Sequence, residues 1–216
     1  RKPGADMFLT KEHVTDAALD GATIVHAGSC SLSAGTAAEA TVYALKEGNA
    51  RGKLVSFDVN YRNLMWNDDQ AACAAAVMEI LPYVDFLKIS DEEADMIGGE
   101  AKIPALMEDK NIALVIETLG SKGARFYWNG LVGEVPALKA ECVDACGAGD
   151  AFWGGFLAHL MKTGVTSAHQ LSEELIRCAM QHGNIAGWLC VQVKGAIESL
   201  PTAAAVDHYW EANYSA

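Results

Sequence analysis

The stretch VDACGAGDAFWGGFLAHL, from Val143 to Leu160, places Gly-Ala-Gly-Asp directly before a long apolar segment with a helical pattern. A carboxylate at the entry to an apolar run is costly unless it is capped, paired or used in chemistry. Small residues at a helix start leave backbone amides uncovered, and these amides form an anion site together with the helix dipole. Asp150 is therefore either an ordinary helix cap in a glycine turn or a base beside an anion site.

Apolar strands alternate with helical patterns on both sides of this stretch. Strands are expected at 22–27, 53–58, 84–89 and 113–117, with a hairpin of 124–128 and 131–136 around Asn129-Gly130. Helices are expected at 34–47 (ending at Gly48), 69–81, 91–97, 103–110, 148–161, 172–189 and 202–214. This alternation predicts a three-layer α/β fold, with a mostly parallel sheet sandwiched between helices. Ligands of such sheets bind beyond the carboxyl ends of the strands.

The composition of the chain indicates which classes of binding partner are unfavourable. The 216 residues are 51% hydrophobic and carry a net charge of -12, which argues against nucleic acid or an anionic membrane as a partner. A small anionic ligand needs only a local positive site. The six cysteines form no Cys-x-x-Cys pair, and no apolar run reaches membrane-spanning length. We therefore expect a cytoplasmic protein with reduced thiols.

Five segments, in order, resemble the motifs of the ribokinase-like (PfkB) carbohydrate kinases. They are 56–62 (SFDVNYR), 88–93 (KISDEE), 117–123 (ETLGSKG), 143–152 (VDACGAGDAF) and 194–202 (KGAIESLPT). Segments 1–6, 26–32 and 60–66 are most similar to those of bacterial fructokinases. The chain contains neither a Walker A pattern nor a Rossmann glycine fingerprint, so a bound nucleotide would be held in another way.

The resemblance implies a role for each matching residue. Asp150 would be the base that deprotonates a sugar hydroxyl, and the amides of Gly147, Ala148 and Gly149 would hold the transferring phosphoryl group. Thr118 and Gly120 would contact the phosphates and ribose of ATP, and Asn184 falls where the family touches adenine. Each position also has a structural alternative: a cap for Asp150, a plain turn for Thr118 and Gly120, and a surface helix residue for Asn184.

The resemblance also implies cation and sugar contacts. Glu93 would help to hold Mg²⁺ through water, or would lie on a solvated helix face. The monovalent-cation loop of the family, which would bind K⁺, matches Asp144, Cys146, Cys190, Val193, Gly195 and Ser199. Arg62 and Arg1 are the expected sugar contacts, although Arg62 could instead form a salt bridge at a sheet edge. Ser90 stands where the family usually has asparagine.

Family members usually carry further residues before the position of Arg1, including a small lid sheet that often dimerises. We therefore expect residues 1–216 to be the C-terminal two-thirds of a single kinase domain, without the lid, and the full-length protein to be a homodimer. The expected activity is transfer of the γ-phosphate of ATP to a primary hydroxyl of a sugar, with fructose as the first candidate. The alternatives are a 2-keto-3-deoxygluconate kinase, a kinase for a nucleoside or vitamin precursor, and a non-catalytic nucleotide-binding remnant.

Overall fold

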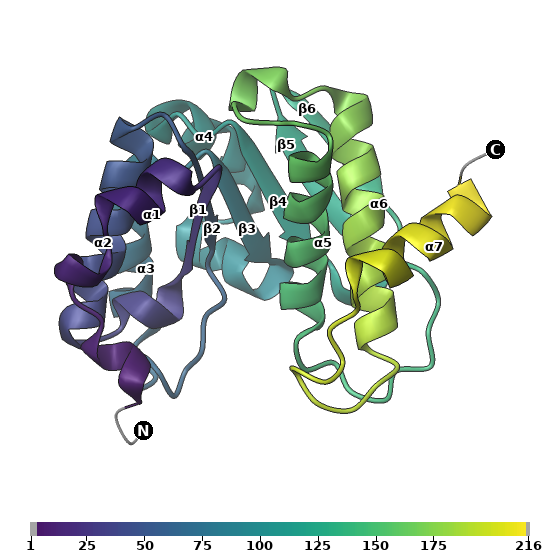
Figure 1. Cartoon of the computed structure of the whole chain (residues 1–216), viewed down its shortest axis with the longest axis horizontal. Helices are drawn as coiled ribbons and strands as arrows, with labels where there is room; N and C mark the ends of the chain where they lie inside the picture. The colour runs from purple at the N-terminus through teal and green to yellow at the C-terminus, as the bar shows by residue number, and fades with distance from the viewer. Residues whose placement is uncertain (1–3, 215–216) are drawn as a thin grey trace. The chain divides into compact units, whose positions relative to one another are not determined.

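The structure is a computed structural model, and it describes residues 4–214. Its sheet has six strands in the order β1-β2-β3-β4-β5-β6, and β1, β2 and β3 pair in parallel (Figure 1). The strands are β1 Ile24–Gly28, β2 Leu54–Asp58, β3 Phe86–Ser90, β4 Leu114–Thr118, β5 Ala124–Trp128 and β6 Leu131–Val135. All six predicted strands are present. The β5–β6 turn has positive φ at Asn129 and Gly130, as a two-residue hairpin turn requires.

Seven α-helices accompany the strands in the part of the chain that the structure describes. They are α1 Asp16–Gly21, α2 Gly35–Ala50, α3 Gln70–Ile80, α4 Ile103–Lys110, α5 Ala148–Lys162, α6 Glu173–Cys190 and α7 Ala203–Tyr214. Every predicted helix is found, except that Asp91–Ile97 is a 3₁₀ helix. The first helix, α1, was not expected from the sequence.

Local chemistry explains where the helices begin and end. The Asp69 side chain accepts a hydrogen bond from the Ala72 amide at 2.8 Å and starts α3, and Ser172 caps α6 in the same way through Leu175. Asn111, with φ 58°, ends α4 in the left-handed conformation that asparagine tolerates. These caps are why the predicted and observed boundaries agree closely.

The prediction that α2 ends at Gly48 is wrong, because the helix continues to Ala50. Gly48 is buried within the helix, and a Cβ atom placed there would lie 2.8 Å from Cγ2 of Val25 in β1. The glycine therefore allows the helix to approach the strand closely, which is a packing role rather than a terminating one.

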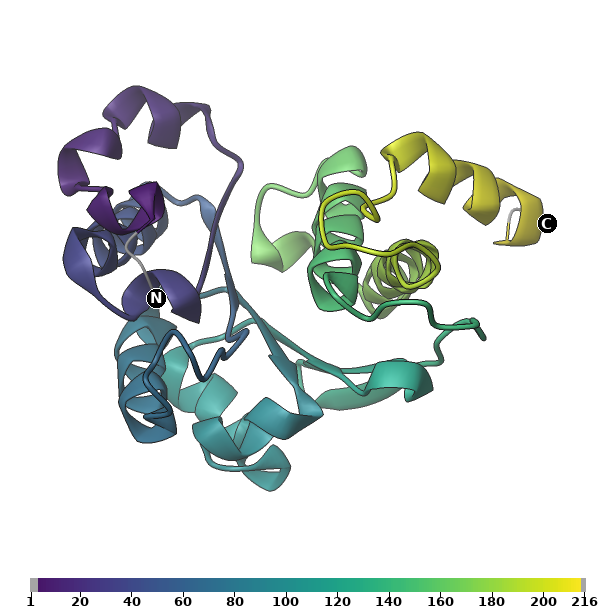
Figure 2. The same cartoon turned by 90° about the horizontal axis from the view of Figure 1, so that it is seen from below.

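Contacts divide the chain into two compact units. The first comprises the chain up to Glu117 with Phe126–Val132 and Thr166–Ala168, and the second comprises Thr118–Arg125, Gly133–Val165 and the chain from His169 onward. The largest core cluster of the first unit includes the fully buried Val55, Phe57 and Leu87. In the second unit, α5 and α6 run side by side in both views (Figures 1 and 2) and pack extensively on each other. The single kinase domain expected from the sequence stays a prediction.

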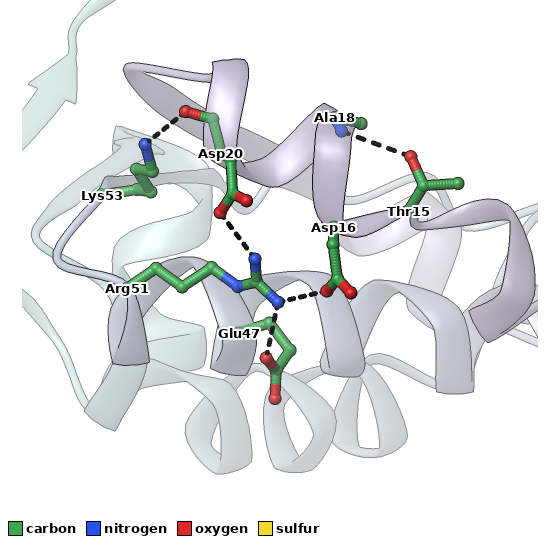
Figure 3. Close-up of polar contacts among 7 residues, drawn as sticks. All are labelled: Thr15, Asp16, Ala18, Asp20, Glu47, Arg51 and Lys53. Atoms are coloured by element: carbon green, nitrogen blue, oxygen red, sulfur yellow. Dashed lines mark hydrogen bonds and ion pairs between the residues drawn. The ribbon is translucent and has the colours of Figure 1, made fainter.

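A charged cluster ties α1 to the end of α2 on the surface of the first unit (Figure 3). The Arg51 guanidinium contacts Asp16, Asp20 and Glu47, and its bond to Asp20 is 2.6 Å long. The hydrogen bonds to the Asp20 and Asp16 carboxylates raise the pKa of Arg51. Exposed ion pairs add little to stability, so this network mainly orients the short α1 helix.

No helix within residues 4–214 combines the length and the apolar character needed to cross a membrane.

Candidate active site

The start of α5 has the geometry of an anion site. Gly147 immediately precedes the helix with φ 82°, which favours glycine, and a Cβ atom there would also crowd the Ala196 carbonyl oxygen at 3.1 Å. The N-terminal amides of a helix have no carbonyl of their own helix to bind. Ala148 already donates to the Ala145 carbonyl at 3.2 Å, which leaves Gly147 and Gly149 as the better donors of the three predicted. Asp150 follows in the first turn and is exposed.

Asp144 organises the loops that frame this helix start. Its Oδ1 accepts the Cys146 amide at 2.9 Å, and its Oδ2 accepts the Gly195 amide at 3.1 Å. These two bonds, the Cys146 bond first, lower the pKa of Asp144. The buried Cys190 thiol lies 3.7 Å from the Cys146 carbonyl oxygen and 3.2 Å from the Ser199 hydroxyl. Hydrogen bonds therefore link all six predicted cation-loop residues, because the Val193 amide also donates to the Cys190 carbonyl, at 3.2 Å.

The predicted nucleotide residues lie in the same unit. Gly120, with φ 57°, opens a 3₁₀ turn one residue after the end of β4 at Thr118. The amide of the intervening Leu119 donates to the Gly123 carbonyl across this turn at 2.8 Å. Asn184 lies on α6 and is not a plain surface residue, because its Nδ2 donates to the Pro136 carbonyl at 3.0 Å. It therefore anchors the segment that follows β6.

Aromatic residues and Gly155 in α5 serve helix packing. Phe152, Trp153 and Phe156 are buried, and the Trp153 and Phe156 rings stack with centroids 4.8 Å apart. A Cβ atom at Gly155 would lie 2.9 Å from both the Ala186 Cβ and the His182 carbonyl oxygen of α6. Glycine is therefore what allows α5 and α6 to pack so closely.

A cavity of about 470 Å³ is lined by α5, α6 and the start of α7, and Asp150 is among its lining residues. The rings of His159 and His182, which also line it, lie 3.9 Å apart. Burial, and then the neighbouring His182, lower the pKa of His159 to about 4. Burial likewise lowers the pKa of His182, whose Nδ1 donates to the Cys178 carbonyl at 2.8 Å. Both rings are therefore neutral near pH 7.

Two further predicted residues, Glu93 and Arg62, belong to the first unit. Glu93 is buried rather than on a solvated face: its Oε1 accepts the Tyr61 amide at 2.7 Å and its Oε2 the Ser90 amide at 2.9 Å. Ser90 and Glu93 form a capping box, which the Ser-x-x-Glu spacing could have revealed. Arg62 is exposed, and its Nη1 donates to the Tyr61 carbonyl at 2.9 Å. Arg1 lies outside the described residues.

Sequence reasoning missed a buried ion pair between Asp58 and Lys88 in the first unit. A signal for it exists, because a single charged residue occurs near the end of each of two apolar strands. Which two strands are neighbours is settled only by the fold, so the pairing itself could not be predicted.

The fold belongs to the three-layer, mostly parallel α/β class of the ribokinase-like kinases. Over 96% of the chain it superposes on a fructokinase from Vibrio cholerae O395 in its fructose, ADP and potassium ion bound form, with a TM-score of 0.83 and 30% identity. Over 98% of the chain it superposes on a fructokinase from Xylella fastidiosa with bound ATP, with a TM-score of 0.86 and 27% identity. The chain covers 66% and 68% of those two structures.

Sequence comparison leads to the family. The family model described as pfkB family carbohydrate kinase matches residues 2–203. The chain is 35% identical over 209 residues to Fructokinase-2 of Oryza sativa subsp. japonica, and 35% identical over 209 residues to the probable fructokinase-5 of Arabidopsis thaliana. It belongs to the pfkB family of carbohydrate kinases. The matched region is 94% of this chain but only 61% and 63% of these two relatives.

Proposed function

We propose that the protein is an ATP-dependent sugar kinase that phosphorylates a primary hydroxyl, with fructose as the first candidate substrate. The observation that carries the proposal is the glycine turn before α5. There Gly147, at φ 82°, places the first amides of the helix next to Asp150 in the first turn. Phosphoryl transfer needs two parts at this position: donors that bind the transferring phosphoryl group, and a base that takes the proton of the attacking hydroxyl. The two superposed fructokinases support this choice of substrates, since one is bound to fructose and ADP and the other to ATP.

In the proposed reaction, Asp150 removes the proton from the sugar hydroxyl. The hydroxyl oxygen then forms a bond to the γ-phosphorus of ATP, while the bond from that phosphorus to the β-γ bridging oxygen breaks and ADP leaves. The amides of Gly147 and Gly149 donate to the non-bridging phosphoryl oxygens as charge moves onto them. Ala148 contributes less, since its amide is engaged with Ala145.

Nucleotide binding is assigned to the second unit. The turn at Thr118 and Gly120 offers backbone donors to the phosphates and ribose. The side-chain NH₂ of Asn184 holds the end of β6 and the segment after it, donating to the carbonyls of Val135 at 3.4 Å and Pro136 at 3.0 Å. The amide oxygen remains as an acceptor for an adenine.

The proposed cations fit the residues to different degrees. Among residues 4–214, no group of three or more His, Cys, Asp and Glu side chains is arranged to hold a metal ion. Mg²⁺ in kinases relies mainly on substrate phosphates, one or two carboxylates and water, so this finding is compatible with it. Each Glu93 oxygen accepts one amide and keeps a further lone pair for a water. When bound, Mg²⁺ would neutralise phosphate charge.

The loop held by Asp144 fits a monovalent cation better. The carbonyl oxygens of Cys146, Cys190, Val193 and Gly195, with the Ser199 hydroxyl, supply the neutral oxygen donors that K⁺ takes. When bound, K⁺ would add positive charge near the helix start. The potassium ion bound to the Vibrio cholerae fructokinase supports this assignment.

Arg62 and Arg1 are the proposed sugar contacts. Guanidinium groups offer several donors in a fixed plane, which suits a polyhydroxylated ligand. The homodimer and the cytoplasmic location of the full-length protein stay predictions.

A coupled ADP-release assay with Mg-ATP, on the protein expressed from the full reading frame, tests the proposal. Fructose, glucose, ribose and 2-keto-3-deoxygluconate are compared side by side. Turnover with fructose above the other three supports a fructokinase. Preferential turnover with 2-keto-3-deoxygluconate moves the assignment to a sugar-acid kinase, and ATP binding without turnover on any sugar favours the non-catalytic remnant.

A further inference from the structure

A buried ion pair joins the carboxyl end of β2 to the middle of β3 in the first unit. Lys88 Nζ lies 2.8 Å from Asp58 Oδ2, and the two side chains are 5% and 4% exposed. The two residues are direct register partners in the parallel ladder. A buried ion pair loses hydration, and an apolar pair of similar volume is often at least as stable. Stability alone therefore does not explain why charges occupy these two positions.

The segment 59–69, which leaves β2, is tied to the end of β3 by further bonds. The Val59 amide donates to the Lys88 carbonyl at 3.0 Å. The buried Glu93 carboxylate then binds the amides of Tyr61 and Ser90, one on each side. We call Asp58, Lys88 and Glu93 the strand-end clamp. Its three side chains fix the first residues of the segment against the chain that follows β3.

The segment held by the clamp has an unusual backbone. Asn60, Asn67 and Asp68 have φ values of 41°, 51° and 62°. Asparagine and aspartate tolerate the left-handed conformation better than other non-glycine residues, so these three positions mark sharp turns of the chain. Arg62 lies within this segment, and its carbonyl accepts the Met65 amide at 2.9 Å, which closes a turn. The segment thus presents an exposed arginine on a backbone of restricted geometry.

We propose that Asp58 and Lys88 are positioning residues for sugar binding. The charged hydrogen bond between them fixes the direction in which the chain leaves β2, and so sets where Arg62 points. An apolar pair would fill the same space without this directional bond. The inference rests on the proposed function, because it assigns Arg62 to the sugar.

Two variants separate positioning from stability. Asp58→Val with Lys88→Met replaces the ion pair by an apolar pair of similar total volume, and we expect it to stay folded with a Tm near that of the wild type. Lys88→Arg keeps the charge and is expected to retain much of the function. Arg51→Met is the matched control, because it also removes a positive charge from the first unit. Arg51 forms ion pairs with Asp16, Asp20 and Glu47 and does not contact the clamp.

Hydrogen–deuterium exchange and steady-state kinetics are measured on the protein expressed from the full reading frame. They report the exchange rates of residues 60–66 and the KM values for the sugar and ATP. In the double variant we expect the amides of residues 60–66 to exchange about tenfold faster, which corresponds to about 1.4 kcal/mol. We also expect the KM for the sugar to rise about tenfold, with the KM for ATP unchanged, as for a lost positioning contact. The Arg51→Met control should leave all three values unchanged.

A folded double variant with wild-type exchange in residues 60–66 and a wild-type KM for the sugar would overturn the inference. An equal rise in the KM for ATP would overturn it as well, because it would show a general loss of structure. If the wild type phosphorylates none of the sugars, the proposed function fails, while the exchange experiment still decides whether the ion pair holds the segment.

Discussion

The strand-end clamp and the start of α5 both hold polar groups in fixed positions, but they do so by different means. The clamp uses buried charges, Asp58, Lys88 and Glu93, to hold a segment with several sharp turns. The start of α5 uses glycine, because Gly147 makes the turn before the helix, and Gly155 in the middle of α5 allows α6 to approach. Under the proposed function, the first region contributes to sugar binding and the second carries the chemistry on the phosphoryl group.

The largest expected effect falls on the second region. We predict that Asp150→Asn lowers kcat by roughly 10²- to 10⁴-fold, as for the loss of a general base. The KM for ATP should change little, since the amide keeps the shape of the carboxylate. Steady-state kinetics with Asp109→Asn as a control would check this, because Asp109 is an exposed helix residue with no proposed role. Near wild-type turnover in Asp150→Asn would rule out its role as the base.

A smaller effect is expected from the first region. We predict that Arg62→Met raises the KM for the sugar about tenfold or more, with little change in the KM for ATP, because the loss of hydrogen bonds to one ligand costs on the order of 1–3 kcal/mol. Lys53→Met serves as the control, since Lys53 binds the Asp20 carbonyl at the end of α1. Equal losses for both substrates would contradict the division of labour between the two regions.

A matched pair of glycines tests the packing of α5. We predict that Gly155→Ala destabilises the protein by about 1–3 kcal/mol through overpacking against α6. Gly154→Ala should instead stabilise it by about 0.5–1 kcal/mol, because a Cβ atom there meets nothing within 4 Å and alanine favours the helix. Urea unfolding of the two variants gives the comparison, and similar effects in both would contradict the close helix contact.

The smallest effect concerns pH. His159 and His182 both have lowered pKa values, so the unfolded chain binds more protons than the folded one as the pH falls below about 6.5. The stability contributed by the neutral rings is therefore present above pH 6.5 and is lost as the pH falls toward 4. The pair also faces Lys162 of α5, which disfavours protonation, and Asp207 of α7, which favours it.

Thermal melts between pH 4 and 7.5 would check this prediction. His159→Phe should flatten the fall of Tm with falling pH, whereas the exposed His208→Gln should leave it unchanged. An unaltered slope in His159→Phe would contradict the prediction.

Local signals account for what the sequence predicted well. Asp69, Ser172 and Asn111 mark helix ends through bonds within a few residues, and Asn129-Gly130 specifies its own turn. The candidate site residues were proposed from motifs, and hydrogen bonds link the predicted cation-loop residues to one another. The predictions that failed concern residues whose role depends on partners far away in the sequence. Gly48 was predicted to end its helix, but it packs against Val25 of β1. The Asp58–Lys88 pair likewise needs the order of the strands, which no local pattern contains.

The α1 helix was missed for a related reason. Its six residues are too few for a clear apolar period, and its orientation depends on Arg51, which lies 31 residues after Asp20. The signal that could have found it is Thr15, whose hydroxyl accepts the Ala18 amide as an N-cap.

The proposed transfer of the γ-phosphoryl group of ATP to a sugar hydroxyl is best followed by ³¹P NMR. A time course of the reaction with Mg-ATP and fructose would be recorded for the protein expressed from the full reading frame and for its Asp150→Asn variant. We predict a sugar monophosphate resonance that grows in step with ADP in the wild type and grows at least about a hundredfold more slowly in the variant. ADP appearing with inorganic phosphate alone, or sugar phosphate forming equally fast in both proteins, would contradict this mechanism.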